Sequence, residues 1–274
     1  METKKLNNKQ VKEALLDTLV YFDKICKKYD LKYTLDAGTL LGAVRHHGFI
    51  PWDDDIDVAM PYKDYKKLIS FSSEINKNNR FIIHGYSKEI NDKENYIYPY
   101  LKLEDNHTIA DFKMNKDQGG AWVDIFPLNN VPANSKLYLK YIRKLRIYYR
   151  LLFIGNRRFK ENQIKSGIRS LIYLDRNRMR DKMIKSIDKL DELPATNYLS
   201  ETIGNCMCDT SAEVFRKKIP VEWFDNLAKL EFEGYKFCAI SEYEKYLTMQ
   251  YGDWKKLPPL EDRVNSHSFD LFRK

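Results

Sequence analysis

The feature that most constrains this chain is a run of carboxylates set inside an apolar stretch. The run Trp52-Asp53-Asp54-Asp55-Ile56-Asp57-Val58 follows Phe49-Ile50-Pro51 and leads into Ala59-Met60. A strand over Trp52–Met60 is expected, and Pro61 would end it. Side chains alternate between the faces of a strand, so Asp53, Asp55 and Asp57 would share one face at successive spacings of about 7 Å.

Carboxylates packed beside an apolar strand cost free energy unless another group neutralises their charge. Mg²⁺ or Mn²⁺ would do so with oxygen ligands and would keep coordination positions open for phosphate oxygens. We therefore predict a metal site with Asp55 and Asp57 as ligands. The alternative is an exposed acidic turn ahead of an ordinary strand, which the apolar neighbours disfavour.

Asp124 is the candidate third ligand. It is the lone charge in the apolar run Ala121-Trp122-Val123-Asp124-Ile125-Phe126, which reads as a strand. A buried aspartate needs a partner, which can be a metal ion or a basic side chain. Both alternatives are open at the level of sequence.

Gly38 and Thr39 form a candidate phosphate site between a strand at Tyr33–Asp36 and a short helix at Leu40–Val44. Glycine lets backbone N–H groups approach an anion closely, and a helix N-terminus attracts phosphate. Arg45 and Lys102 are candidates to complete the phosphate contacts, Arg45 as a fork of donors and Lys102 as a point charge. The alternative for each is an ordinary surface residue.

The remaining pattern predicts an α+β or mixed α/β fold with a basic helical addition. A helix is expected over Asn8–Tyr29, because apolar residues recur every three or four positions and Asn7 with Gln10 forms a capping box. Further elements are expected at 62–69 (helix) and at 81–85, 97–103 and 121–126 (strands). Residues 135–190 read as basic helices.

The charge of the chain is concentrated in one segment. Residues 136–189 contain 17 Lys or Arg against 4 Asp or Glu, whereas the whole 274-residue chain has a net charge of +8. This segment is either a solvated face or a surface for an anionic membrane or acceptor. With no secretory signal or membrane-spanning stretch in the sequence, a cytoplasmic location is expected, with peripheral contact at the inner face of the plasma membrane. Cys206-x-Cys208 is weak evidence for a zinc site.

Two long runs resemble the LicD family of phosphotransferases. They are Leu35-Asp36-Ala37-Gly38-Thr39-Leu40-Leu41-Gly42-Ala43-Val44-Arg45 and Gly48-Phe49-Ile50-Pro51-Trp52-Asp53-Asp54-Asp55-Ile56-Asp57. Val123-Asp124-Ile125-Phe126-Pro127 resembles a second block of that family. Weaker resemblances are Tyr100-Leu101-Lys102-Leu103, Phe232-Glu233-Gly234, and Tyr251-Gly252-Asp253-Trp254 with Pro258-Pro259.

The resemblance implies a nucleotidyltransferase-like mixed sheet flanked by helices, with Thr39 in place of the family's serine. It also implies transfer of a phospho-alcohol, such as phosphocholine, from a CDP-linked donor to a sugar hydroxyl of teichoic acid, lipopolysaccharide or capsule. The acceptor would be a glycan or a lipid-linked glycan. The corresponding division is a catalytic core at 1–134, a basic helical segment at 135–200, and a part at 201–274 that completes the catalytic domain.

In the mechanism expected from this resemblance, Asp55, Asp57 and Asp124 hold one or two Mg²⁺ or Mn²⁺ ions on the donor pyrophosphate. The proton acceptor would be Asp53, Asp54 or Asp124, with His46, His47 and His267 as alternatives. Trp52 would stack on substrate or pack in the core, and His267 falls in the family's C-terminal block.

Two other functions are consistent with the sequence. One is a nucleotidyltransferase that moves a nucleoside monophosphate from a nucleoside triphosphate to a hydroxyl. The other is a non-enzymatic module that binds anions or nucleic acid. The acidic run disfavours the module, because carboxylates repel phosphates unless a metal is bound, and no nucleic-acid partner is expected.

Overall fold

The computed structural model describes residues 4–85, 87, 90, 96, 98–112, 118–156, 176–206, 214, 218–264 and 269–274. The helices are α1 (Asn8–Lys28), α2 (Ala37–His46), α3 (Tyr62–Ser70), α4 (Ser72–Ile75), α5 (Ser135–Asn156), α7 (Arg176–Asp191), α8 (Thr202–Asn205) and α10 (Tyr243–Tyr251), with 3-10 turns η1 (Val221–Phe224) and η2 (Leu260–Asp262). The strands are β1 (Lys4–Lys5), β2 (Thr34–Leu35), β3 (Asp57–Pro61), β4 (Phe81–His84), β5 (Leu101–Phe112), β6 (Gln118–Pro132), β7 (Ala195–Glu201), β8 (Lys218–Pro220), β9 (Ala228–Phe232), β10 (Tyr235–Ala239) and β11 (Phe269–Arg273).

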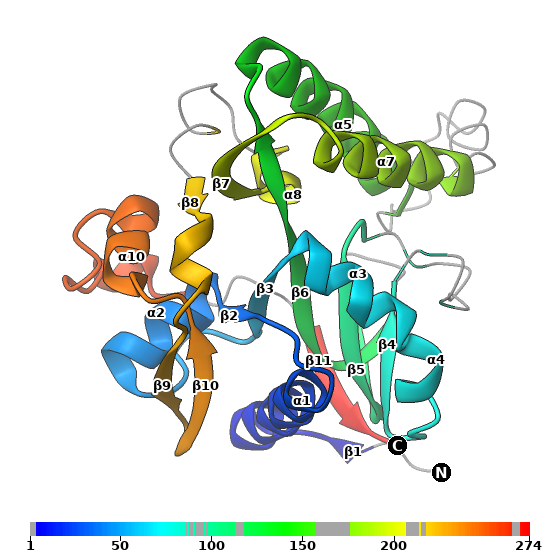
Figure 1. The fold of residues 1–274 in the computed structure, drawn as a ribbon. Helices are drawn as coiled ribbons and strands as arrows, with labels where there is room; N and C mark the ends of the chain where they lie inside the picture. The colour runs from blue at the N-terminus through cyan, green and yellow to red at the C-terminus, as the bar shows by residue number, and fades with distance from the viewer. Residues whose placement is uncertain are drawn as a thin grey trace.

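Nine of the strands in the described residues form one mixed sheet. Its main path runs β1-β11-β5-β6-β3-β2, while β4 pairs with β5 and β7 connects β6 to β8. The pair β3–β6 is parallel, and the other paired strands are antiparallel. Helices flank this sheet, and β9 and β10 make a separate hairpin near α2 (Figure 1). The mixed fold predicted from the sequence is confirmed, and the division at 134 and 200 stays a prediction.

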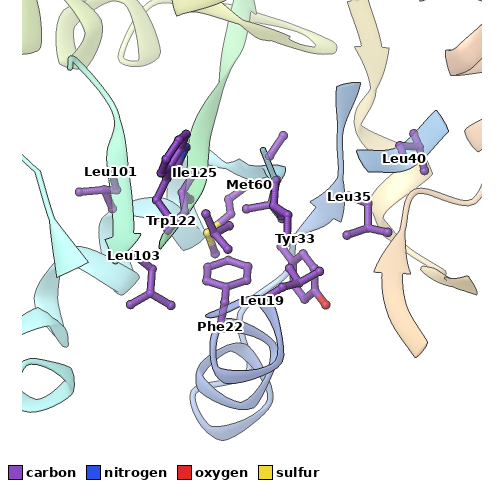
Figure 2. Close-up of a cluster of buried hydrophobic side chains, with 14 of the residues drawn as sticks. Leu19, Phe22, Tyr33, Leu35, Leu40, Met60, Leu101, Leu103, Trp122 and Ile125 are labelled. Carbon is purple, nitrogen blue, oxygen red and sulfur yellow. The ribbon is translucent and has the colours of Figure 1, made fainter. Parts of the chain in front are cut away.

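Helix α1 supplies one wall of the main core. Asn7 and Gln10 form the predicted capping box at its start, and the helix ends close to the predicted boundary. Figure 2 shows Leu19 and Phe22 directed from α1 toward the strands, and both side chains are fully buried. Burial of each such side chain contributes about 1.5–3 kcal/mol, so α1 anchors the sheet that positions the acidic residues.

Four predicted elements have wrong boundaries. The strand expected at 97–103 is β5, which begins at Leu101 and continues to Phe112, and the strand expected at 121–126 is β6, which extends beyond both ends of that range. The other two concern the acidic run and α2. The strand expected at Trp52–Met60 begins only at Asp57, because the Asp53 N–H donates to the Ile50 carbonyl at 2.9 Å and turns the chain before the strand. The helix expected at Leu40–Val44 extends over the whole of α2, because the Asp36 carboxylate accepts from the Ala37 N–H at its start.

The basic helices α5 and α7 lie beside each other at the end of β6 (Figure 1). The chain leaves the sheet after Pro132 and returns at Ala195, and these two residues face each other in the β6–β7 pairing. The Ala133 N–H donates to the Pro194 carbonyl at 2.9 Å and ties the two crossings together. A small core of its own supports this region, formed by Val131, Tyr138, Ile142, Leu190 and Val214.

Within the described part of the chain, no helix combines the length and the apolar character needed to span a bilayer. Residues 157–175 of the predicted basic segment lie outside the described part, and so does Cys208.

Candidate active site

Strand pairing brings acidic residues from separate segments into one row. Asp57 on β3 faces Asp124 on β6, and Lys102 on β5 faces Asp124 from the other side. The Asp36 N–H donates to the Asp57 carbonyl at 3.0 Å, which extends the row by one residue beyond β2. Residues opposite one another in a sheet direct their side chains to the same face, so this row forms the floor of the site.

The loop before β3 adds a second set of carboxylates. Asp53, Asp54 and Asp55 each offer one carboxylate oxygen, and these three oxygens lie within 4.8 Å of one another. The strand predicted for this run is wrong before Asp57, yet Asp53, Asp55 and Asp57 line one pocket, as their shared face predicted. The loop adds Asp54 to the cluster. Such oxygen clusters match the ligand preference of Mg²⁺ and Mn²⁺.

The carboxylates of the site repel one another, because nearby basic groups do not balance their negative charge. Burial, followed by the charge of Asp55 and a hydrogen bond with it, raises the pKa of Asp53 to about 7. Burial raises the pKa of Asp57 well above its ordinary value, and the charges of Asp55 and Asp124 add to the effect. A divalent cation would remove this repulsion, so the residues fit the predicted metal.

Gly38 makes room for one of these carboxylates. A Cβ atom at this position would lie 2.4 Å from the Oδ2 of Asp53, closer than any ordinary contact. Thr39 is buried, and its hydroxyl accepts from the Asp57 N–H at 2.9 Å. Gly38 and Thr39 therefore lock the start of α2 onto the acidic loop and onto β3. Their predicted contact with phosphate stays a prediction.

Asp124 meets the basic partner that the sequence left as an alternative. Its Oδ1 lies 2.8 Å from the Nζ of Lys102, and its Oδ2 accepts from the Trp122 indole N–H at 3.2 Å. Lys102 is only 5% exposed and lies over the rings of Tyr98 and Trp122, at 4.3 and 4.7 Å from their centroids. Lys102 thus faces Asp124 in the row of the sheet, and a role on phosphate is untested.

Arg45 and Trp52 lie at the edge of the carboxylates. A pocket of about 280 Å³ is lined by Trp52 together with Gly38, Asp53, Asp55 and Asp57. The Nη1 of Arg45 donates to the Trp254 carbonyl at 2.9 Å, and its Nε donates to the Nε2 of His46 at 3.0 Å. Trp52 is partly buried, which suits it for contact with a ligand as well as for packing.

The three candidate proton acceptors among the histidines are His46, His47 and His267, and the structure describes the first two. Burial, followed by the charge of Arg45, lowers the pKa of His46 and favours its neutral form. His47 adopts the left-handed conformation that ends α2. His267 lies outside the described residues.

Two tyrosines on α10, Tyr246 and Tyr251, belong to the site although neither was among the site residues predicted from the sequence. The Tyr246 hydroxyl donates to the Oδ1 of Asp36 at 2.7 Å. Burial and then the charges of Asp36 and Asp57 raise the pKa of Tyr251, which lines the carboxylate pocket. The resemblance at Tyr251-Gly252-Asp253-Trp254 was the only signal in the sequence. A distance of about 200 residues along the chain hid the contact.

Comparison with known proteins agrees with this geometry. The family described as "LicD/FKTN/FKRP, nucleotidyltransferase domain" matches residues 30–141, a range that includes the acidic loop and Asp124. The chain is 31% identical over 271 residues to the lipopolysaccharide cholinephosphotransferase LicD of Haemophilus influenzae, covering 96% of this chain and 97% of that protein. The chain belongs to the LicD family. It is a transferase of that family, and its acidic row and loop lie within the matched domain.

Shorter matches reach two further proteins. The ribitol 5-phosphate transferase FKRP of Homo sapiens is 39% identical over 51 residues, which are 19% of this chain and 10% of that protein. An uncharacterized protein of Rickettsia prowazekii is 49% identical over 41 residues, 15% of each chain.

Proposed function

We propose that this protein transfers a phospho-alcohol from a CDP-linked donor to a hydroxyl of a cell-surface glycan. Two relatives support the reaction class, since one is named for cholinephosphate transfer to lipopolysaccharide and another for ribitol 5-phosphate transfer. The observation that carries the proposal is the carboxylate loop at Asp53–Asp55 beside the row of Asp57 and Asp124. The acceptor is a glycan or lipid-linked glycan of the lipopolysaccharide, teichoic acid or capsule type.

Mg²⁺ or Mn²⁺ is the proposed cofactor. Asp55 and Asp57 would hold it, with Asp54 and Asp124 close by, because raised carboxylate pKa values mark uncompensated negative charge at this place. When bound, the ion supplies a positive charge that stabilises the donor pyrophosphate and its leaving group.

Asp53 is our candidate for the acceptor of the hydroxyl proton. A general base works best when its pKa is near the working pH; burial raises the pKa of Asp53 in that direction, and Asp53 lines the carboxylate pocket. Asp124 is less suited, because Lys102 and Trp122 already engage its two oxygens. Asp53 accepts the proton as the acceptor oxygen attacks the phosphorus that bears the alcohol, and CMP leaves with the electron pair of the broken P–O bond.

The proposal is tested by release of CMP from CDP-choline, CDP-glycerol and CDP-ribitol, with Mg²⁺ or Mn²⁺ and a cell-envelope glycan extract as acceptor. We expect metal-dependent release that Asp57→Asn lowers by at least 100-fold. Asp225→Asn, which removes an exposed carboxylate away from the row, is the matched control and should retain full activity. Release of pyrophosphate from a nucleoside triphosphate, with none from any CDP donor, would instead identify a nucleotidyltransferase.

A further inference from the structure

A second hollow continues from the carboxylate pocket. It has a volume of about 820 Å³ and shares Leu41, Ile50, Trp52 and Tyr251 with that pocket. It lies between α2 and the segment that follows α10, two elements that are neighbours in Figure 1. We call this hollow the Arg45–Arg263 groove. Its continuity with the pocket means that one ligand can occupy both.

The charge of the groove is opposite to that of the pocket. Arg45, Lys256 and Arg263 line it, against the single carboxylate of Asp253. The Nε of Arg45 donates to His46 and its Nη1 donates to the Trp254 carbonyl, whereas its Nη2 has no hydrogen-bond partner among the described residues. A groove with this balance attracts an anion and repels a quaternary ammonium group.

The groove also offers flat aromatic surface. Trp52 stands at its junction with the carboxylate pocket, and the guanidinium of Arg263 lies 5.5 Å from the Trp52 ring centroid. Tyr251 remains 46% exposed at the same junction. A planar ring beside a guanidinium group is suited to a heterocyclic base that carries a phosphate, because both the ring and the anion find a partner.

We propose that the Arg45–Arg263 groove binds the nucleoside monophosphate half of the donor, with Trp52 against the base and Arg263 and Arg45 on the phosphate and ribose. This inference rests on the proposed function and assigns the two ends of the donor. The alcohol end then points away from the groove, toward the acidic row, where a cationic alcohol such as choline meets carboxylates and not guanidinium groups.

Binding of CMP to the full-length protein, measured by isothermal titration calorimetry in EDTA and again in Mg²⁺, tests the assignment. We expect Arg263→Gln and Trp52→Leu each to weaken CMP binding at least tenfold. Lys245→Gln is the control, because Lys245 is exposed, pairs with Glu242 and does not line the groove. The fold of each variant is checked by its melting temperature, and Arg263→Lys serves as a conservative second variant.

The outcomes separate the groove from the transferase reaction. CMP binding that both variants weaken, without turnover of any CDP donor, supports the groove and removes the proposed function. Turnover of a CDP donor with CMP affinity unchanged in Arg263→Gln and Trp52→Leu overturns the groove alone. If the wild-type protein binds no CMP, the proposed role of the groove is also overturned. If Arg263→Gln and Trp52→Leu then weaken the binding of a glycan acceptor, the groove is an acceptor site.

Discussion

The ion pair between Lys102 and Asp124 gives the sharpest test of how the floor of the site is held. Both residues are nearly buried, with 5% and 7% exposure, and their charged atoms are 2.8 Å apart. Removal of one partner from a buried pair leaves an unpaired charge and costs about 3–5 kcal/mol. We therefore expect Lys102→Met to lower the free energy of unfolding by that amount, although methionine fills a similar volume.

Urea denaturation followed by circular dichroism at pH 8 measures this cost. The double variant Lys102→Met/Asp124→Asn should recover about 2–3 kcal/mol relative to the sum of the single variants, because neither charge is then left alone. Lys255→Met is the control, since Lys255 is largely exposed and its nearest carboxylate, on Glu244, is 4.0 Å away. A cost below about 1 kcal/mol for Lys102→Met, or strict additivity in the double variant, would refute the reasoning.

Three further predictions follow from the same site. Gly38→Ala should displace the Asp53 carboxylate, which lies 2.4 Å from the added Cβ, and should lower transferase activity at least tenfold, as measured by initial rates. Because the pKa of Asp53 rises from 3.8 to about 7 in the folded protein, the folded state binds more protons between these values. The free energy of unfolding in EDTA should therefore fall as the pH rises from about 4 to about 7 and level off above that pH; urea titrations of Asp53→Asn should show a shallower fall, because the pKa of Asp57 is raised as well. Tyr246→Phe removes the hydrogen bond to Asp36 and should cost about 1–2 kcal/mol in a urea titration, while an unchanged midpoint would argue against that contact.

The sequence predicted the parts of the fold that depend on local pattern. Helix α1 follows from its apolar period and from the capping pair Asn7 and Gln10, and the structure has both. The grouping of acidic residues was also readable, because Asp53, Asp54 and Asp55 are adjacent in the chain. The predicted strand was wrong for these three residues, because they lie in a loop before β3. The hydrogen bond from the Asp53 N–H to the Ile50 carbonyl forms a turn that residue alternation does not reveal.

Contacts between distant segments were beyond the sequence. Nothing in the local pattern indicates that Lys102 pairs with Asp124, because that pairing depends on the register of β5 against β6. Tyr246 reaches Asp36 across 210 positions for a similar reason, since α10 packs against α2. The partial burial of Asp57 is likewise a product of the assembled sheet.

The closure of the chain at Ala133 and Pro194 has a consequence for how this enzyme can change over evolution. The helices α5 and α7 leave and rejoin the sheet at neighbouring points, joined by one backbone hydrogen bond. The outward-facing residues of the two helices can therefore vary while the strands on either side keep their register. Leu145, Leu152, Met183 and Ile187 belong to the main core, so the faces that pack on the sheet are constrained. Changes of charge on the exposed surface of this helical pair are thus separated from the strands that carry Asp57 and Asp124.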